Sequence, residues 1–216
     1  MIDQETPCIK QELEAGLRAY LGRPARITDL ERRPQEASSH PIDRMRVTLD
    51  SGERLRMLFK RPRPGDKLYG NEREVLIYQR LLAGRRFSAP ALYASVYDKP
   101  RGIYWLFLED VGELTLKHGE REDWLAAVRW LARMHAAYLG REDELQALGC
   151  LHEHGPDYYH LITATVRDYL RQAGTRHALA RFDSLMGRYD TLIAFLVRQP
   201  RTLLHGDIMS KNLMLQ

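Results

Sequence analysis

LLHGDIMSKNLML, residues 203–215, encloses one acid and one amide between two apolar runs. A His-Gly turn comes before Asp207, and four residues separate Asp207 from Asn212. A short loop between two strands would place these two side chains on the same side of a cleft. The segment therefore has the layout of a catalytic loop.

The spacing of Asp207 and Asn212 suits phosphoryl transfer from ATP. In this reaction the protein needs a carboxylate to orient and deprotonate the attacking hydroxyl, and an oxygen ligand to hold Mg²⁺ on the phosphates. Asp207 would be the base and Asn212 the metal ligand, while His205 and Gly206 would shape the turn. The alternative is a surface turn that holds an Asp and an Asn by chance. The Asn at this offset and the flanking apolar runs favour the catalytic loop.

The motif resembles the His-Gly-Asp loop of the aminoglycoside phosphotransferase and choline kinase-like superfamily, which corresponds to the His-Arg-Asp loop of protein kinases. The resemblance implies an α+β, protein-kinase-like fold with two lobes. We expect an N-lobe of antiparallel sheet plus helix over residues 1–108, a hinge at 109–113 and a mostly helical, incomplete C-lobe over 114–216. It also implies ATP-dependent phosphorylation of a small-molecule hydroxyl, with ATP and Mg²⁺ as cofactors.

Composition agrees with a globular protein of the cytoplasm. The chain has 216 residues, of which 44% are hydrophobic, and can bury a sizeable core. The net charge of +4 comes from cations interspersed with acids, so a nucleic-acid partner is not expected. No signal peptide or membrane-spanning run is evident. Cys8 and Cys150 fit neither a zinc site nor a disulfide framework, which favours reduced thiols.

The first half predicts a helix followed by strands. Apolar residues recur at helical spacing over residues 7–21, and residues 25–30 suit a first strand. A polar segment at 31–41 is expected to be a loop. Alternating runs at 45–49 and 55–60, joined by the turn sequence Asp50-Ser51-Gly52-Glu53, predict a β-hairpin.

Lys60 ends the second arm of this hairpin, where a kinase carries the lysine that binds the nucleotide phosphates. The alternative is an ordinary solvated lysine. A helix expected over residues 71–84 places Glu74 in its apolar arc, and an acid there needs a cation. We therefore predict an ion pair between Lys60 and Glu74, with Glu72 as the second choice. The helix also resembles the corresponding helix of the superfamily.

Two further strands lead to the expected hinge. Residues 92–97 and the apolar run 103–108 predict strands, and the second ends abruptly at Glu109. A kinase places its hinge at such a boundary, so backbone groups near Glu109, Asp110 and Val111 would bind the adenine edge. A strand-to-loop boundary without this role is the alternative.

The second half is expected to be helical. Helices are predicted over residues 124–139, 158–172 and 179–197, the first of them central and apolar over much of its surface. His135 is interpreted as a packed core histidine. Residues 140–157 are expected to be loop-rich, and the histidines there and nearby, His152, His154 and His160, fit no metal-ligand pattern.

Two departures from the superfamily pattern stand out. No glycine occurs between residues 31 and 41, so a phosphate lid would use Ser38, Ser39 and backbone amides. The second metal-holding aspartate, which in the superfamily follows the His-Gly-Asp loop, is also missing. We therefore expect the front portion of a longer kinase that binds MgATP poorly in isolation. A nucleotide-binding pseudokinase without transferase activity and a partner-binding helical protein are the alternatives.

Overall fold

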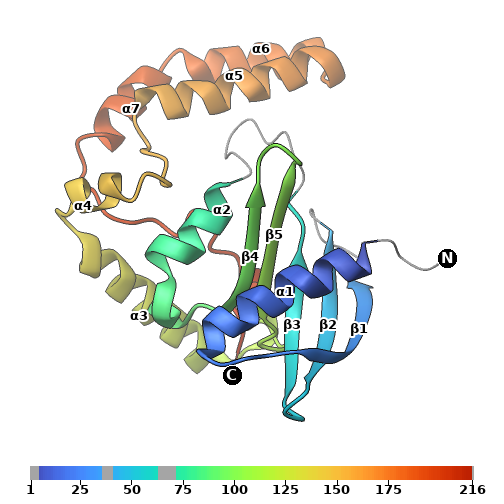
Figure 1. Ribbon diagram of the computed structural model, residues 1–216. Coiled ribbons are helices and arrows are strands. Elements are labelled where there is room, and N and C mark those ends of the chain that lie inside the picture. The colour runs from blue at the N-terminus through green and yellow to red at the C-terminus, as the bar shows by residue number, and fades with distance from the viewer. Residues whose placement is uncertain (1–4, 36–40, 63–71, 216) are drawn as a thin grey trace. The chain divides into compact units, whose positions relative to one another are not determined.

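The computed structural model describes residues 5–35, 41–62 and 72–215. Two compact units divide the chain between them (Figure 1). Unit 1 comprises Met1–Met134, Leu148–Cys150 and Leu204–Gln216, and unit 2 comprises His135–Ala147 and Leu151–Leu203. The α+β, kinase-like class predicted from the sequence is confirmed by an antiparallel sheet with helices before and after it. The lobe boundaries at 108 and 113 stay a prediction.

Unit 1 is built on a five-stranded antiparallel sheet in the order β1-β2-β3-β5-β4. The strands are β1 (Ile27–Gln35), β2 (Ile42–Leu49), β3 (Arg54–Lys60), β4 (Leu92–Asp98) and β5 (Ile103–Glu109). Side chains alternate between the two faces, and the core lies on the face of Met45, Val47, Met57 and Phe59. The predicted hairpin is confirmed, and the predicted strands at 92–97 and 103–108 are each one residue longer.

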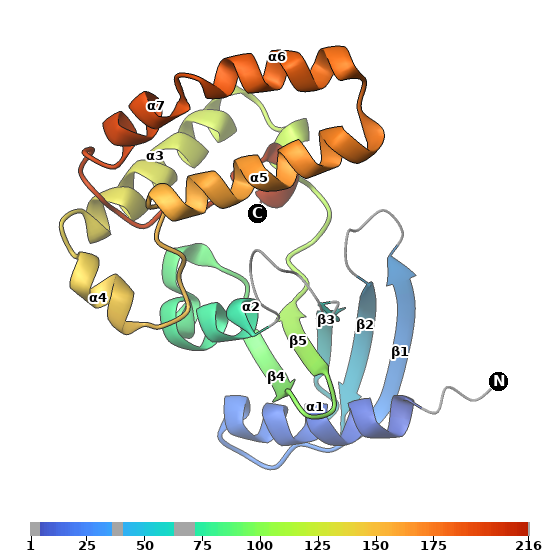
Figure 2. The same ribbon diagram turned by 90° about the horizontal axis from the view of Figure 1, so that it is seen from above.

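Helix α1 (Thr6–Leu21) covers the core face of the sheet (Figures 1 and 2). Ile9, Leu13 and Leu17 are fully buried, which confirms the helix predicted over residues 7–21. A Cβ atom on Gly16 would lie 2.2 Å from Cβ of Ala94 in β4. Only glycine therefore allows the helix to approach the sheet this closely.

Strand β1 is longer than expected, so the loop predicted over residues 31–41 is wrong for its first half. Residues 31–35 belong to β1 and pair with β2, with Pro34 opposite Asp43. The polar side chains did not suggest a strand because β1 is an edge strand held by backbone pairing, and an edge strand tolerates proline. Ser38 and Ser39, the predicted phosphate lid, lie outside the described residues.

Residues 73–88 contain helix in three different forms. It begins with α2 (Arg73–Leu76), continues as a π-helical turn η1 (Ile77–Leu81) and ends in a 3₁₀ helix η2 (Ala83–Ser88). The amide of Leu82 donates to the carbonyl of Ile77 at 3.0 Å, five residues back. A helix was predicted over residues 71–84, but the wider turn inside it was not.

Helix α3 (Arg121–Tyr138) runs from unit 1 into unit 2. Met134 and Tyr138 are buried, but Trp124, Leu125 and Val128 are exposed. These exposed side chains differ from the expectation of a central helix, because no described part of unit 1 covers them. His135 is half-buried, and its carbonyl accepts a hydrogen bond from Thr202.

Unit 2 holds four further helices, α4 (Glu142–Ala147), α5 (Pro156–Ala173), α6 (Arg176–Met186) and α7 (Tyr189–Leu196). The predicted helix at 158–172 is confirmed. Helix α4 lies in the segment expected to be loop-rich, and the single helix expected at 179–197 is two helices separated at Gly187 and Arg188. The apolar periodicity continues across this break, which is why it was missed.

Two further expectations concern membrane-spanning segments and the state of the cysteines. None of the helices in the described ranges has both the length and the apolar composition needed to cross a bilayer. Cys8 and Cys150 are both free thiols, and Cys150 is buried, so its pKa is raised by desolvation.

Candidate functional site

Lys60 and Glu74 form the ion pair expected from the sequence. Nζ of Lys60, the last residue of β3, lies 2.6 Å from Oε1 of Glu74 in the first turn of α2. The two side chains are 21% and 34% exposed, so the pair lies at the end of the central strand β3 and is partly open to solvent. Glu74, and not the second choice Glu72, is the partner. Its role toward a nucleotide stays a prediction.

Tyr78 is a partly buried neighbour of this ion pair. The phenol follows Glu74 by one helical turn and packs against Val75, Leu106 and Leu108. Burial, with a smaller contribution from the carboxylate of Glu74, raises the pKa of Tyr78. The phenol therefore stays protonated at a pH where an exposed tyrosine would ionise, and its ring packs on the apolar cluster next to Glu74 in the chain.

Only some backbone groups of the predicted hinge form hydrogen bonds with the sheet. The amide of Glu109 donates to the carbonyl of Ala91 at 2.8 Å, and the amide of Asp110 donates to the carbonyl of Arg56 at 3.1 Å. Within the described ranges, no hydrogen bond involves the backbone of Val111. Of the three hinge residues, Val111 thus has both backbone groups available to a ligand.

Asp110 anchors residues 109–113, the predicted hinge, to the sheet through its side chain. The carboxylate is 5% exposed and accepts hydrogen bonds from Arg44 at 3.1 Å, from Arg56 at 3.4 Å and from the amide of Gly112 at 3.0 Å. Sequence reasoning missed this anchor, because its partners lie 66 and 54 residues away. The surplus of arginines on the polar face of the hairpin is the one signal that could have suggested an acidic partner.

A cavity of about 410 Å³ lies beside this anchor, and we call it the hinge cavity. Its lining comes from β1, β2, β3 and the hinge: Glu31, Arg33, Arg44, Met45, Arg46, Arg56, Asp110 and Glu113. Arg44 and Arg56 point away from the core face that carries Phe59, as Lys60 does. The cavity therefore opens on the same face of the sheet as Lys60.

The loop around Asp207 is held by its own hydrogen bonds. Nδ2 of Asn212 donates to Oδ2 of Asp207 at 2.7 Å and to its carbonyl at 3.1 Å. Gly206 has a φ of 80°, a left-handed conformation that favours glycine, and a 3₁₀ turn η4 (Ser210–Asn212) closes the loop. Because Nδ2 of Asn212 faces Asp207, the side-chain oxygen of Asn212 remains available for a cation.

His205 supports the acid from the preceding turn. Its Nδ1 accepts a hydrogen bond from the amide of Asp207 at 3.3 Å, and its ring contacts Trp130 edge-on with centroids 5.9 Å apart. Partial desolvation lowers the pKa of His205, and the charge of Asp207 opposes this effect. A neutral imidazole is what the hydrogen bond from the amide requires.

The end of the loop pairs with the segment that follows the hinge. The amide of Leu116 donates to the carbonyl of Leu213, and the amide of Leu215 donates to the carbonyl of Leu114, both at 2.8 Å. Thr115 and Met214 form a single antiparallel bridge. The two full strands expected around the loop are therefore reduced to this bridge. This pairing ties the Asp207 loop to residues 114–116, just after the predicted hinge.

Residues 39–216 match the Phosphotransferase enzyme family. The chain belongs to this family. Membership confirms the resemblance to the aminoglycoside phosphotransferase and choline kinase-like superfamily drawn from the His205-Gly206-Asp207 motif. Comparison with curated proteins and with solved structures gave no match.

The predicted site residues of this member of the phosphotransferase family form two separate pairs. Lys60 contacts Glu74, and Asp207 contacts Asn212, but none of the contacts among the described residues joins one pair to the other. No group of three or more His, Cys, Asp or Glu side chains in the described ranges could hold a metal ion alone. Asn212 and Asp207 offer hard oxygen atoms, which is the ligand type that Mg²⁺ takes together with substrate phosphates.

Proposed function

We propose that this chain carries the nucleotide-binding and catalytic residues of an ATP-dependent phosphotransferase that acts on a hydroxyl group of a small molecule. Membership of the phosphotransferase family supports the reaction class. The observation that carries the proposal is the 2.6 Å contact of Lys60 and Glu74, residues fourteen positions apart that a kinase uses together.

Each residue has a defined task in this reaction. Lys60, held by Glu74, would contact the nucleotide phosphates, and backbone groups of Glu109 and Val111 would contact the adenine edge. Asp207 would accept the proton of the acceptor hydroxyl as the hydroxyl oxygen bonds to the γ-phosphorus. The bond from that phosphorus to the β–γ bridging oxygen then breaks, and ADP leaves.

The oxygen of Asn212 would hold Mg²⁺ together with phosphate oxygens. When bound, the cation neutralises charge on the phosphates. The hydrogen bond from Asn212 to Asp207 would keep the two oxygen donors at a fixed spacing, because rotation of either side chain breaks it. His205 would hold the backbone of Asp207 in the turn.

Transfer of radiolabelled phosphate from ATP to a panel of amino sugars, amino alcohols, sugars and macrolides tests the proposal. The full-length product of the gene should label at least one acceptor class, and Asp207→Asn should abolish labelling. Asp143→Asn, an exposed acid of α4, is the matched control and should retain activity. ATP binding without transfer to any acceptor would instead indicate a nucleotide-binding pseudokinase.

A further inference from the structure

Trp130 contacts two segments of unit 1 that are distant from each other in the sequence. Its indole Nε1 donates a hydrogen bond to the carbonyl of Phe87 at 2.9 Å. Its ring meets the ring of His205 edge to face, with centroids 5.9 Å apart and planes at 70°. All three residues belong to unit 1. One side chain thus joins the end of the helical segment at residues 73–88 to the turn that precedes Asp207.

The carbonyl that binds the indole comes from a strained stretch of backbone. Phe87 and Ser88 have φ angles of 57° and 54°, in the left-handed region that residues other than glycine rarely adopt. Such a conformation persists only where surrounding contacts hold it, and the hydrogen bond from Trp130 is one of them. The bond also fixes the indole, because rotation of the ring would break it. Trp130 therefore meets His205 in one defined orientation.

His205 passes this restraint on to Asp207. Its Nδ1 accepts a hydrogen bond from the amide of Asp207 at 3.3 Å, which requires one orientation of the imidazole. Edge-to-face aromatic pairs are favourable at centroid separations of about 4.5–7 Å, so the contact with Trp130 stabilises that orientation. Gly206, between His205 and Asp207, has a φ of 80° and no side chain that could hold the turn. The backbone of Asp207 thus depends on the imidazole.

The segment that ends at Phe87 also carries the anchor of the other pair. Glu74 lies in the first turn of this segment and contacts Lys60. The pair of Lys60 and Glu74 has no direct contact with the Asp207 loop among the described residues. Trp130 provides an indirect connection, because it binds one end of the segment and packs against the turn of the loop.

These contacts give Trp130 a task in the site. We propose that Trp130 is a positioning residue of the phosphotransfer site, which holds His205, and through it the backbone of Asp207, against the segment that carries Glu74. The inference rests on the proposed function, in which Asp207 is the base. Phosphoryl transfer relies on the position of its catalytic groups, and a displacement of about 1 Å can cost about a hundredfold in rate.

Backbone ¹⁵N relaxation of the chain measures the effect on Asp207 without reference to catalysis. In the parent protein the order parameter of the Asp207 amide should be about 0.85, the value of a rigid backbone. Trp130→Leu removes both the N–H donor and the ring, and should lower the order parameter below about 0.6. Trp130→Phe keeps a ring against His205 but loses the donor, and should give a value between the two.

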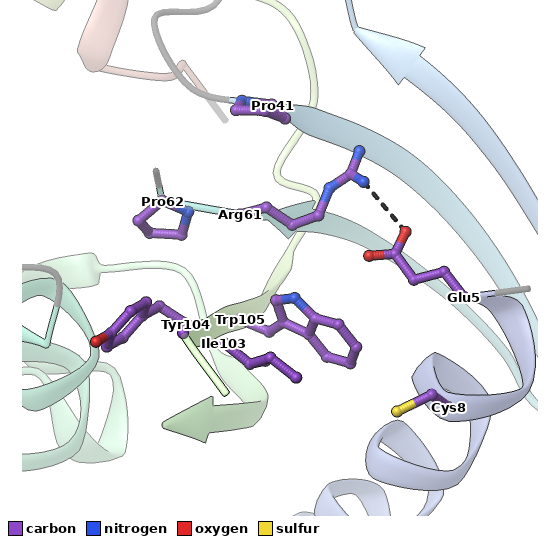
Figure 3. Close-up of a pocket in the computed structure, with 9 residues that line it drawn as sticks. Glu5, Cys8, Pro41, Arg61, Pro62, Ile103, Tyr104 and Trp105 are labelled. Carbon is purple, nitrogen blue, oxygen red and sulfur yellow. Dashed lines mark hydrogen bonds and ion pairs between the residues drawn. The ribbon is translucent and has the colours of Figure 1, made fainter. Parts of the chain in front are cut away.

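The other tryptophans of the chain supply matched controls. Trp124 lies on the same helix α3 and is 46% exposed, and Trp105 lines a cavity beside α1 in the core of the sheet (Figure 3). Trp124→Leu and Trp105→Phe make the same chemical changes there and should leave the order parameter of Asp207 unchanged. An unchanged order parameter in Trp130→Leu, or an equal loss in the controls, would overturn the proposal.

Kinetics of the full-length gene product separate positioning from nucleotide binding. In Trp130→Leu, kcat should fall about tenfold to a hundredfold, because the base is displaced. The KM for MgATP should change by less than about twofold, since Trp130 contacts none of the residues proposed to bind the nucleotide. Trp130→Phe should restore part of kcat. A raised KM with an unchanged kcat would contradict a positioning role.

A double variant tests whether Trp130 acts through His205. His205→Ala together with Trp130→Leu should lower kcat no further than His205→Ala alone, because the imidazole that Trp130 holds is already absent. Additive losses would refute this route. If the full-length product phosphorylates no acceptor, the proposed function fails, and the order parameter of Asp207 still decides whether Trp130 holds the loop.

Discussion

Replacing Glu74 by Gln removes the charge that pairs with Lys60 and keeps the size of the side chain. The pair is short, at 2.6 Å, but Lys60 is 21% and Glu74 34% exposed. Exposed pairs contribute about 0.2–1 kcal/mol, whereas breaking a fully buried pair costs about 3–5 kcal/mol. Because solvent screens a side chain that is one-third exposed, we expect the free energy of unfolding to fall by about 1 kcal/mol.

Glu72 supplies the matched control. Glu72→Gln makes the same chemical change two residues earlier, at a side chain that does not contact Lys60 in the structure. Equilibrium unfolding in urea should therefore leave Glu72→Gln within about 0.5 kcal/mol of the parent protein. The difference between the two variants isolates the ion pair from any general effect of removing an acid from this helix.

The effect on nucleotide binding should exceed the effect on stability. Without its anchor, Lys60 is free to leave the position from which it would contact phosphate, so the affinity for MgATP should fall about tenfold, as expected for a lost charge-assisted contact. Isothermal titration of the two variants measures this directly. Equal affinities and equal stabilities of Glu72→Gln and Glu74→Gln would refute the assigned role of the pair.

Three further predictions concern stability. Gly16→Ala should destabilise unit 1 by about 2 kcal/mol in urea unfolding, because its new Cβ would lie 2.2 Å from that of Ala94. Asp110→Ala should cost about 3 kcal/mol, since it leaves two arginines without their buried partner, whereas Glu113→Ala, 77% exposed, should cost less than about 0.5 kcal/mol; equal losses would contradict the anchor. The raised pKa of Tyr78 means that the folded chain keeps a proton that the unfolded chain releases above about pH 10, so the free energy of unfolding should fall as pH rises beyond that value. Tyr78→Phe should reduce this alkaline loss in unfolding titrations, and an unchanged pH profile would argue against it.

Patterns within one or two elements were sufficient to predict much of unit 1. Alternation of apolar and charged residues predicted the hairpin, and its register placed Lys60 at the end of β3. Glu74 was found because an acid within an apolar arc needs a cation nearby. Both arguments use only short-range spacing and the cost of burying a charge.

Features that depend on distant partners could not be predicted in the same way. The carboxylate of Asp110 finds Arg44 across 66 residues, and nothing in either local pattern couples them. The strand at 31–35 depends on backbone pairing with β2, to which its polar side chains contribute little. The break at Gly187 was hidden because apolar residues keep their helical spacing on both sides of it.

The π-helical turn at Ile77–Leu81 also has a consequence for how this chain tolerates changes in length. A π turn contains one residue more than an α-helical turn, so the helix that begins at Arg73 already accommodates a one-residue insertion. Deleting one residue from this turn would restore α-helical geometry and leave Glu74, which precedes it, opposite Lys60. The same deletion in the middle of α1 would rotate the following side chains by about 100° and turn Leu17 out of the core. Natural length variation within the helical segment at residues 73–81 is therefore expected to concentrate at residues 77–81.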